Sequence, residues 1–181
     1  MIFRCMRKCM ESDEPCEFTY REMEKLMSKT TPCPLGENNY FDEVDEDNEF
    51  FCVIVGTRTY QDYQEFKFIV DHMLPQNEDL HIVIVSGGAK GADELAERYA
   101  KEKQYELIIF KANWELDGKS AGYLRNERMH KYIARKRKRG VIAFWDGLSR
   151  GTEHSLRLSK KYENPIKVYL YKEKRFKKDG I

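Results

Sequence analysis

The sequence predicts an α/β protein with a Rossmann-like, doubly wound, mainly parallel sheet of about five strands and helices on both faces. Three observations predict this class. The 181 residues, at 21.6 kDa, suit one ordinary domain with an extension. A hydrophobic content of 41% can bury a sizeable core. Apolar runs rich in β-branched residues alternate with amphipathic helical patterns, and strands that are apolar on both faces indicate a parallel sheet covered on both sides.

The elements follow one another from residue 51 onward. Strands are expected where β-branched and aromatic residues cluster, over 51–56, 81–88, 106–112, 141–147 and 166–171. Helices are expected between them where apolar residues recur at helical spacing, over 62–74, 92–103, 121–137 and 152–161. Ligands of such sheets bind outside the carboxyl ends of the strands, so the residues that follow each strand are the candidates for function.

The first 49 residues read as an acidic extension, and the domain proper is expected over residues 50–181. The first 50 residues hold 13 Asp or Glu against 6 Lys or Arg, a net charge of −7, whereas the rest of the chain carries +8. Within the extension we expect a short amphipathic helix over 19–28 and an acidic linker over 36–50. The basic domain favours anionic partners, and the acidic extension can shield or mimic such a partner.

Several functional classes find no support in the sequence. Cysteines 5, 9, 16 and 33 form no CxxC pair and no histidine precedes His72, so we expect no metal site. No apolar run approaches the roughly 18 residues that span a bilayer, so we expect a cytoplasmic protein without a signal peptide or membrane partner. Neither HExxH nor GxSxG occurs, which disfavours metallohydrolases and serine hydrolases. We expect no cofactor.

A glycine-rich turn follows the second expected strand. Glycines there let backbone amides approach an anion, and the start of the next helix adds unpaired N–H groups and the positive end of its dipole. We therefore predict a phosphate cradle made of Ser86, Gly87, Gly88, Lys90 and Gly91. The alternative is a tight turn that needs positive φ. Asp93 is expected either to complement the helix start or to bond a ribose hydroxyl.

The turn after the fourth expected strand repeats this device. Gly147, Ser149, Gly151 and Thr152 offer amides and hydroxyls, and Arg150 adds charge. Two cradles at one edge of a sheet predict two anionic groups on the ligand.

Side chains after the first and third strands complete the predicted site. Thr57 and Arg58 follow the first strand, and Arg58 either forks two bonds to a phosphate or is a solvated loop arginine. Trp114 either stacks on a base or fills the core. Arg125 and Asn126 begin a helix toward the same edge.

The run RKRKR at residues 135–139 permits a nucleic-acid interpretation, because adjacent cations can neutralise backbone phosphates. A solvated helix end is the interpretation that we favour. Cations suit a helix C-terminus, Gly140 follows as a stop, and no aromatic residues interleave with the run.

Four motifs occur in order along the chain: VGTR (55–58), SGGAKGADELAERYA (86–100), ANWELDGKSAGYLRNERM (112–129) and IAFWDGLSRGTEHSL (142–156). Together they closely resemble the YspA-like branch of the SLOG superfamily. The resemblance implies a Rossmann-like fold that recognises nucleotides or nucleotide-derived ligands, in a class often placed in signalling and in phage–host conflict. Gly56, Lys119 and Asp146 lie within these motifs and join the expected ligand contacts.

The wider superfamily includes LOG-type phosphoribohydrolases, which cleave the base from a nucleoside monophosphate, and DprA-type proteins, which bind single-stranded DNA. The LOG-type relatives are commonly dimers, which implies a homodimer here. Arg125 matches the arginine of their RKxxM motif, and Gly151 with Thr152 matches the GT of GGxGTxxE. Ser155 stands where their glutamate lies, and Glu153 projects about 200° away from that position around the helix.

We therefore hypothesise a sensor, carrier or sequestering protein that holds a nucleotide-derived small molecule across both glycine turns. The first alternative is an N-glycosidic hydrolase that uses Arg125 with Glu153 or Asp93, because cleavage of that bond needs a carboxylate. The second is a single-stranded DNA-binding module. A further hypothesis is that the acidic extension closes over the basic cleft as a lid.

Overall fold

The computed structural model describes residues 2–5, 17–19, 41–44, 48–77 and 79–177. The chain divides into two compact units, Met1–Asp47 and Asn48–Ile181. In the first unit, three short strands form an antiparallel sheet of order β2-β1-β3: β1 (Ile2–Cys5), β2 (Glu17–Thr19) and β3 (Phe41–Val44).

The sequence predicted a helix and a linker in the extension, and the structure tests only part of these predictions. The helix expected over 19–28 lies outside the described residues except at Thr19, which ends β2. The prediction of a linker over 36–50 was wrong at two places. Strand β3 forms within this range, and the next strand begins at Glu49. Apolar Phe41 and Val44 pair with β1, so the acidic residues between them do not prevent a strand.

The second unit is built on a six-stranded sheet of order β6-β5-β4-β7-β8-β9. The strands are β4 (Glu49–Gly56), β5 (His81–Ser86), β6 (Glu106–Ile109), β7 (Arg139–Trp145), β8 (Ile166–Leu170) and β9 (Arg175–Phe176). The first five run parallel, and the short edge strand β9 runs antiparallel to β8. The predicted α/β class with a mainly parallel sheet is confirmed.

The helices of this unit are α2 (Tyr63–Met73), α3 (Ala92–Lys103), α4 (Trp114–Asp117), α5 (Ala121–Ala134) and α6 (Arg150–Lys161), with a 3-10 turn, η2 (Gly118–Ser120), before α5. The side chain of Asp62 accepts a hydrogen bond from the Glu65 amide, which begins α2. The helix expected over 121–137 ends at Ala134. Among the described helices, none is long and apolar enough to cross a membrane.

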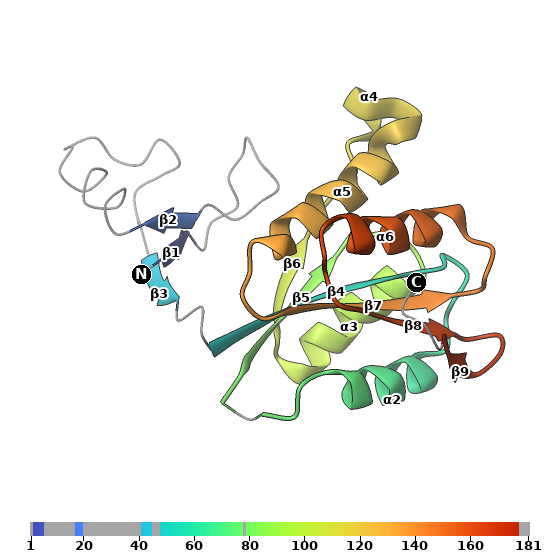
Figure 1. The fold of residues 1–181 in the computed structure, drawn as a ribbon, viewed down its shortest axis with the longest axis horizontal. Helices are drawn as coiled ribbons and strands as arrows, with labels where there is room; N and C mark the ends of the chain where they lie inside the picture. The colour runs from blue at the N-terminus through green and yellow to red at the C-terminus, as the bar shows by residue number, and fades with distance from the viewer. Residues whose placement is uncertain (1, 6–16, 20–40, 45–47, 78, 178–181) are drawn as a thin grey trace. The chain divides into compact units, whose positions relative to one another are not determined.

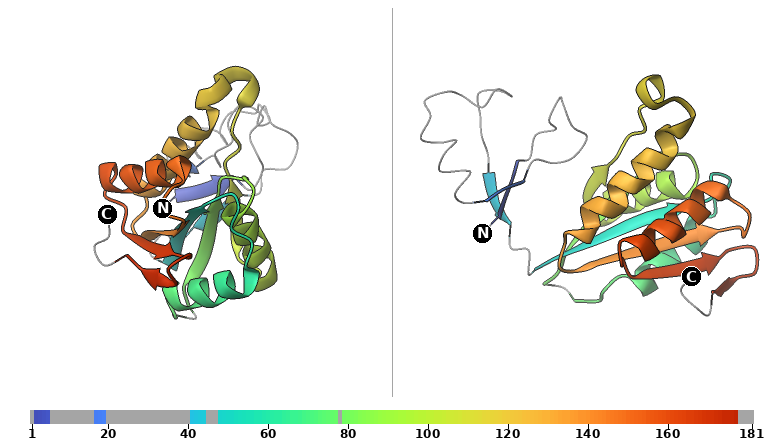
Figure 2. Two further views of the ribbon diagram at one scale, coloured as in Figure 1. Left: turned by 90° about the vertical axis from the view of Figure 1, so that its right-hand side faces the viewer. Right: turned by 45° about the horizontal axis from the view of Figure 1, so that its top comes forward.

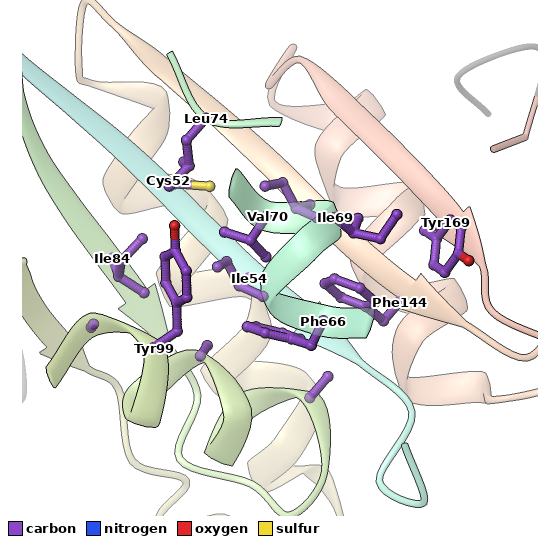
Figure 3. Packing of buried hydrophobic residues seen from close by; sticks show 14 of the residues in the cluster. Cys52, Ile54, Phe66, Ile69, Val70, Leu74, Ile84, Tyr99, Phe144 and Tyr169 are labelled. Carbon is purple, nitrogen blue, oxygen red and sulfur yellow. The ribbon is translucent and has the colours of Figure 1, made fainter. Parts of the chain in front are cut away.

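Helices cover both faces of the sheet, with α2 and α3 on one side and α5 and α6 on the other (Figures 1 and 2). Alternate residues of β4 serve the two cores, since Ile54 packs with the α2 and α3 cluster and Val53 with the α5 cluster. Figure 3 shows the first cluster, in which Phe66 and Tyr99 meet over Ile54. Cys52 lies in the same cluster, and burial raises the pKa of its thiol to about 12.

The strand order reverses between β4 and β7. The chain leaves β4 toward β5 and β6 on one side, then returns to β7 and β8 on the other. In an open α/β sheet, such a switch point separates the two loops that follow the neighbouring strands and leaves a crevice between them. The loops after β4 and β7 therefore frame the place where a ligand is expected.

Candidate functional site

A cavity of about 420 Å³ lies at this switch point. Its walls come from the ends of β4 and β7, the starts of α3 and α6, and the segment from α4 to α5. Twelve of the residues expected from the sequence line it: Gly56, Thr57, Arg58, Asp93, Trp114, Lys119, Arg125, Asn126, Asp146, Ser149, Gly151 and Thr152. The structure therefore brings together side chains that are almost 100 positions apart in the sequence.

Eight other expected residues do not line the cavity: Ser86, Gly87, Gly88, Lys90, Gly91, Gly147, Arg150 and Glu153. Most of them belong to the turn at residues 86–91, which we call the first glycine turn. The turn at residues 146–151, the second glycine turn, contributes three lining residues. The two turns therefore differ in access to the cavity.

Three amides of the first glycine turn already have partners within the protein. Gly88 donates to Ser86 Oγ at 3.1 Å, Ala89 to Asp93 Oδ2 at 3.3 Å, and Gly91 to Glu94 Oε2 at 3.2 Å. Two of these acceptors are carboxylate oxygens, which accept hydrogen bonds from amides as phosphate oxygens do. The anion position expected at this turn is thus served by side chains of α3.

The glycines of the first turn allow close packing. Gly91 has a φ of 81°, and a Cβ there would lie 2.5 Å from the Thr57 carbonyl oxygen. Any other residue would therefore be strained and would push the β4 loop away from α3. Gly87 has the same role toward Arg125, whose guanidinium occupies the space that a Cβ would need.

Arg125 forms a buried ion pair with Asp93. Its Nη1 lies 3.3 Å from Asp93 Oδ2 and also donates to the Gly87 carbonyl oxygen. Burial raises the pKa of Asp93 to about 6, against the opposing charge of Arg125. Burial also lowers the pKa of Arg125, and the charge of Asp93 opposes that shift. Most of the charge of Arg125 is therefore balanced inside the protein.

The second glycine turn is held by its own side chains. Asp146 Oδ1 accepts from the amides of Leu148 and Ser149 at 2.9 and 2.7 Å, and Ser149 Oγ accepts from the Thr152 amide at the start of α6. Trp145 Nε1 donates to the Ser149 carbonyl oxygen at 3.2 Å. Burial alone would raise the pKa of Asp146, but its hydrogen bonds, with those from the Leu148 and Ser149 amides the largest, together outweigh burial and lower the pKa. Asp146 is thus an ionised carboxylate in the cavity wall.

Exposed aromatic and basic side chains line the outer part of the cavity. Trp114 is 55% exposed and Tyr123 is 45% exposed, so Trp114 does not fill the core. Arg58 and Lys119 are exposed on the same rim. The side chain of Asn113 accepts from the Leu116 amide at 3.0 Å, which starts the short helix that carries Trp114. Aromatic faces and cations at one opening can hold a planar, anionic ligand.

One buried residue of the cavity was not an expected ligand contact. Ser155 is fully buried, lines the cavity, and its Oγ has no hydrogen-bond partner within the described part of the chain. It lies three residues after Thr152 on α6, so both face the cavity. That spacing is the signal that points to it. The other lining residues outside the expected set are Val55, Thr59, Ala89, Gly122 and Tyr123.

Glu153, the residue that the hydrolase alternative pairs with Arg125, faces solvent on α6. Its Oε1 lies 2.5 Å from Arg157 Nη2, and the residue does not line the cavity. A carboxylate committed to an exposed ion pair outside the cavity is poorly placed to act on a ligand held within it.

The basic run at residues 135–139 lies at the other end of the sheet, where α5 ends and β7 begins. Lys136 is only 4% exposed, and its Nζ lies over the rings of Phe51 and Tyr132. Arg139 donates to Asn164 Oδ1 and to the Lys136 carbonyl oxygen. The run is thus partly packed into the fold. It lies at the start of β7, whereas the cavity lies at the opposite end of that strand.

Comparison with known proteins identifies relatives of this domain. The family model described as the YspA, cpYpsA-related SLOG family matches residues 52–116. The Gene 61 protein of Mycobacterium phage D29 is 37% identical over 90 residues, which cover 47% of this chain and 69% of that protein.

A solved structure of DNA processing protein A from Helicobacter pylori, described for its single-stranded DNA binding mode, is 23% identical with a TM-score of 0.49. The match covers 68% of this chain and 66% of the Helicobacter pylori chain. The family match falls on the unit that carries the cavity, and the chain belongs to the YspA, cpYpsA-related SLOG family.

Proposed function

We propose that the cavity binds a nucleotide or a nucleotide-derived small molecule and holds it without breaking a bond. The observation that carries this proposal is the composition of its walls. A helix start, two exposed cations, an ionised carboxylate, buried hydroxyls and two exposed aromatic rings all converge on one space of about 420 Å³. That volume lies in the range of ordinary small-molecule sites.

The anionic part of the ligand lies at the start of α6. Helix geometry leaves the first N–H groups of a helix without a partner in the helix, and Ser149 already serves the amides of Thr152 and Glu153. The N–H groups of Arg150 and Gly151 remain for a phosphate oxygen, with the positive end of the helix dipole behind them. Arg58 and Lys119 add charge from the rim.

The sugar and the base find different partners. Asp146 is ionised and can accept hydrogen bonds from ribose hydroxyls, while Ser155 and Asn126 can both donate and accept. A buried hydroxyl without a partner costs about 1–3 kcal/mol, so a ligand that bonds to Ser155 gains that amount. Trp114 and Tyr123 offer faces on which a base can stack.

Binding without turnover follows from the placement of the acidic groups. Glu153 pairs with Arg157 outside the cavity, and Asp93 is buried against Arg125. Ser155 stands at the position where the resemblance to LOG-type enzymes implies a glutamate. The protein would then act as a sensor, carrier or sequestering protein, in signalling or in phage–host conflict as the family resemblance implies.

The test is to incubate the purified protein with AMP, NAD, ADP-ribose and cyclic AMP, measure binding by calorimetry, and separate the products by chromatography. We expect at least one of these compounds to bind and to be recovered unchanged. The Trp114→Ala variant should bind it more weakly, by about tenfold, which corresponds to roughly 1.4 kcal/mol of lost stacking. Released base would instead support hydrolysis, for which Asp93 and Asp146 are the two carboxylates that line the cavity among the described residues.

The DNA-binding alternative makes a separate prediction. If phosphate contacts by residues 135–139 dominated, single-strand affinity would fall steeply with salt and with neutralisation of Arg135, Arg137 and Lys138. Because the run lies at the other end of the sheet from the cavity, we expect these substitutions to leave nucleotide affinity unchanged. Tight, salt-sensitive binding of single strands without any nucleotide binding would favour the alternative.

A further inference from the structure

Three metal-ligating side chains meet at the end of the sheet that lies opposite the cavity. Glu49, His81 and Glu106 are the first residues of β4, β5 and β6. Glu49 pairs with His81 across the parallel ladder, and Glu106 lies opposite Val83, two residues farther along β5. We call these three residues the strand-start cluster. They come from segments that are far apart in sequence and are aligned by the register of the sheet.

The strand-start cluster occupies one face of the sheet. Side chains two positions apart on a strand point to the same face. The residues two positions after its members, Phe51, Val83 and Ile108, all belong to the hydrophobic cluster beneath α5 and α6. The three ligand side chains therefore project from that face, just beyond the edge of the cluster.

The spacing of the ligand atoms suits a small cation. One ligand atom from each member lies within 4.8 Å of the others, and His81 Nε2 lies 3.3 Å from Glu106 Oε2. Two ligands held by a tetrahedral zinc ion at about 2.0–2.2 Å are themselves about 3.3–3.5 Å apart. The Glu49 residue is only 7% exposed, whereas the His81 side chain is 54% exposed. The arrangement thus has a buried carboxylate and an open side for water ligands.

We propose that the strand-start cluster binds a divalent transition-metal ion, with Zn²⁺ as the best match. An imidazole nitrogen and two carboxylate oxygens form a mixed ligand set that suits zinc. Two carboxylates this close repel each other, and a divalent cation between them turns the repulsion into attraction. Glu49 lies about 20 Å along β4 from Val55 in the cavity wall, at about 3.3 Å per residue, so the ion joins three strand starts and takes no part in ligand binding.

Lys136 is a cation that can compete on this face, because its Nζ lies 4.8 Å from the centroid of the Phe51 ring. The test therefore compares zinc uptake by the metal-free full chain with uptake by His81→Ala and Glu106→Gln. The matched controls are His72→Ala and Glu173→Gln, at exposed positions outside the cluster. Cysteines of the extension can take zinc on their own, so the readout is the difference in bound zinc between variants.

We expect the wild type and both controls to bind one zinc ion more than His81→Ala does. We also expect the wild type and both controls to bind that ion more than about tenfold more tightly than Glu106→Gln does. Because a variant can fail to fold, a second measurement uses the wild type alone. Zinc should shift the imidazole ¹⁵N resonances of His81 and leave those of His72 unchanged. Equal zinc uptake by all variants, or a His81 signal that does not move at saturating zinc, would overturn the proposal. Neither outcome bears on the cavity.

Discussion

The first glycine turn, at residues 86–91, and the second, at residues 146–151, both join a strand to a helix at the carboxyl edge of the sheet. Both contain glycine at positive φ and a basic residue. In the first turn, three amides bond to side chains of the turn and of α3, and Gly91 packs against the β4 loop. In the second turn, a Cβ at Gly147 or Gly151 would meet nothing within 4 Å, and Gly151 lines the cavity.

The difference shows that a glycine turn serves packing or binding according to its neighbours. Asp93 and Glu94 follow the first turn closely enough to accept hydrogen bonds from the amides of Ala89 and Gly91, which would otherwise be available to an anion. Asp146 does this only for the outer amides of the second turn, and the start of α6 remains open to the cavity. The first turn therefore packs the β4 loop against α3, whereas the second turn lines the cavity.

The largest expected effect comes from adding one methyl group to each turn. Gly91→Ala should lower the free energy of unfolding by about 3 kcal/mol or more, because the new Cβ meets backbone atoms at positive φ. Gly151→Ala should change it by less than about 1 kcal/mol, in the stabilising direction, because the position is helical and open. Urea unfolding of both variants provides the measurement. Equal losses would mean that the two turns carry the same packing.

The second effect concerns pH and the ion pair behind the first turn. The pKa of Asp93 is about 6 in the folded protein against 3.8 for an ordinary aspartate, so the folded state binds the proton more tightly. The contribution of Asp93 to stability therefore falls as the pH rises through the window from about 4 to 6. Relative to the wild type, Asp93→Asn should gain about 2 kcal/mol of unfolding free energy between pH 4 and pH 7.

Urea midpoints at the two pH values, with the exposed Asp79→Asn as the control, measure this shift. A variant that loses stability relative to the wild type as the pH rises would show that Arg125 holds Asp93 ionised, and that burial is the weaker influence.

The smallest effect separates the two turns by ligand affinity. Lys119 lines the cavity and Lys90 does not, although both are exposed lysines. Lys119→Ala should weaken AMP binding about fivefold, close to 1 kcal/mol, through the loss of one charged contact. Lys90→Ala should leave the affinity within the error of calorimetry. A larger loss of AMP affinity in Lys90→Ala than in Lys119→Ala would show that the anion binds at the first turn instead.

The sequence predicts the elements better than it predicts the use of the turns. Helix α3 begins and ends at the residues expected, because glycine precedes it and its apolar positions repeat every three to four residues. The helix α4, four residues long, and the strand β9, two residues long, are too short to show any period, so they were not expected. Trp114 could not be assigned because a single aromatic residue carries no information on its exposure.

The lining of the cavity was predictable where a motif follows a strand, as at Thr57, Arg58, Asp146 and Thr152. The occupation of the first turn was not, because it depends on the rotamers of Asp93 and Glu94 rather than on their identity. The burial of Arg125 against Asp93 likewise joins two helices whose distance no local pattern reveals.

Backbone amide resonances provide the most direct test of the central claim, because each turn then reports for itself. In a ¹⁵N-labelled sample titrated with AMP to millimolar concentration, we expect the amides of Arg150 and Gly151 to shift in a saturable way. Those of Gly88 and Gly91 should stay in place, since they lie outside the cavity lining and their protons already bond to Ser86 and Glu94. Saturable shifts at Gly88 and Gly91, with Gly151 unmoved, would contradict the account.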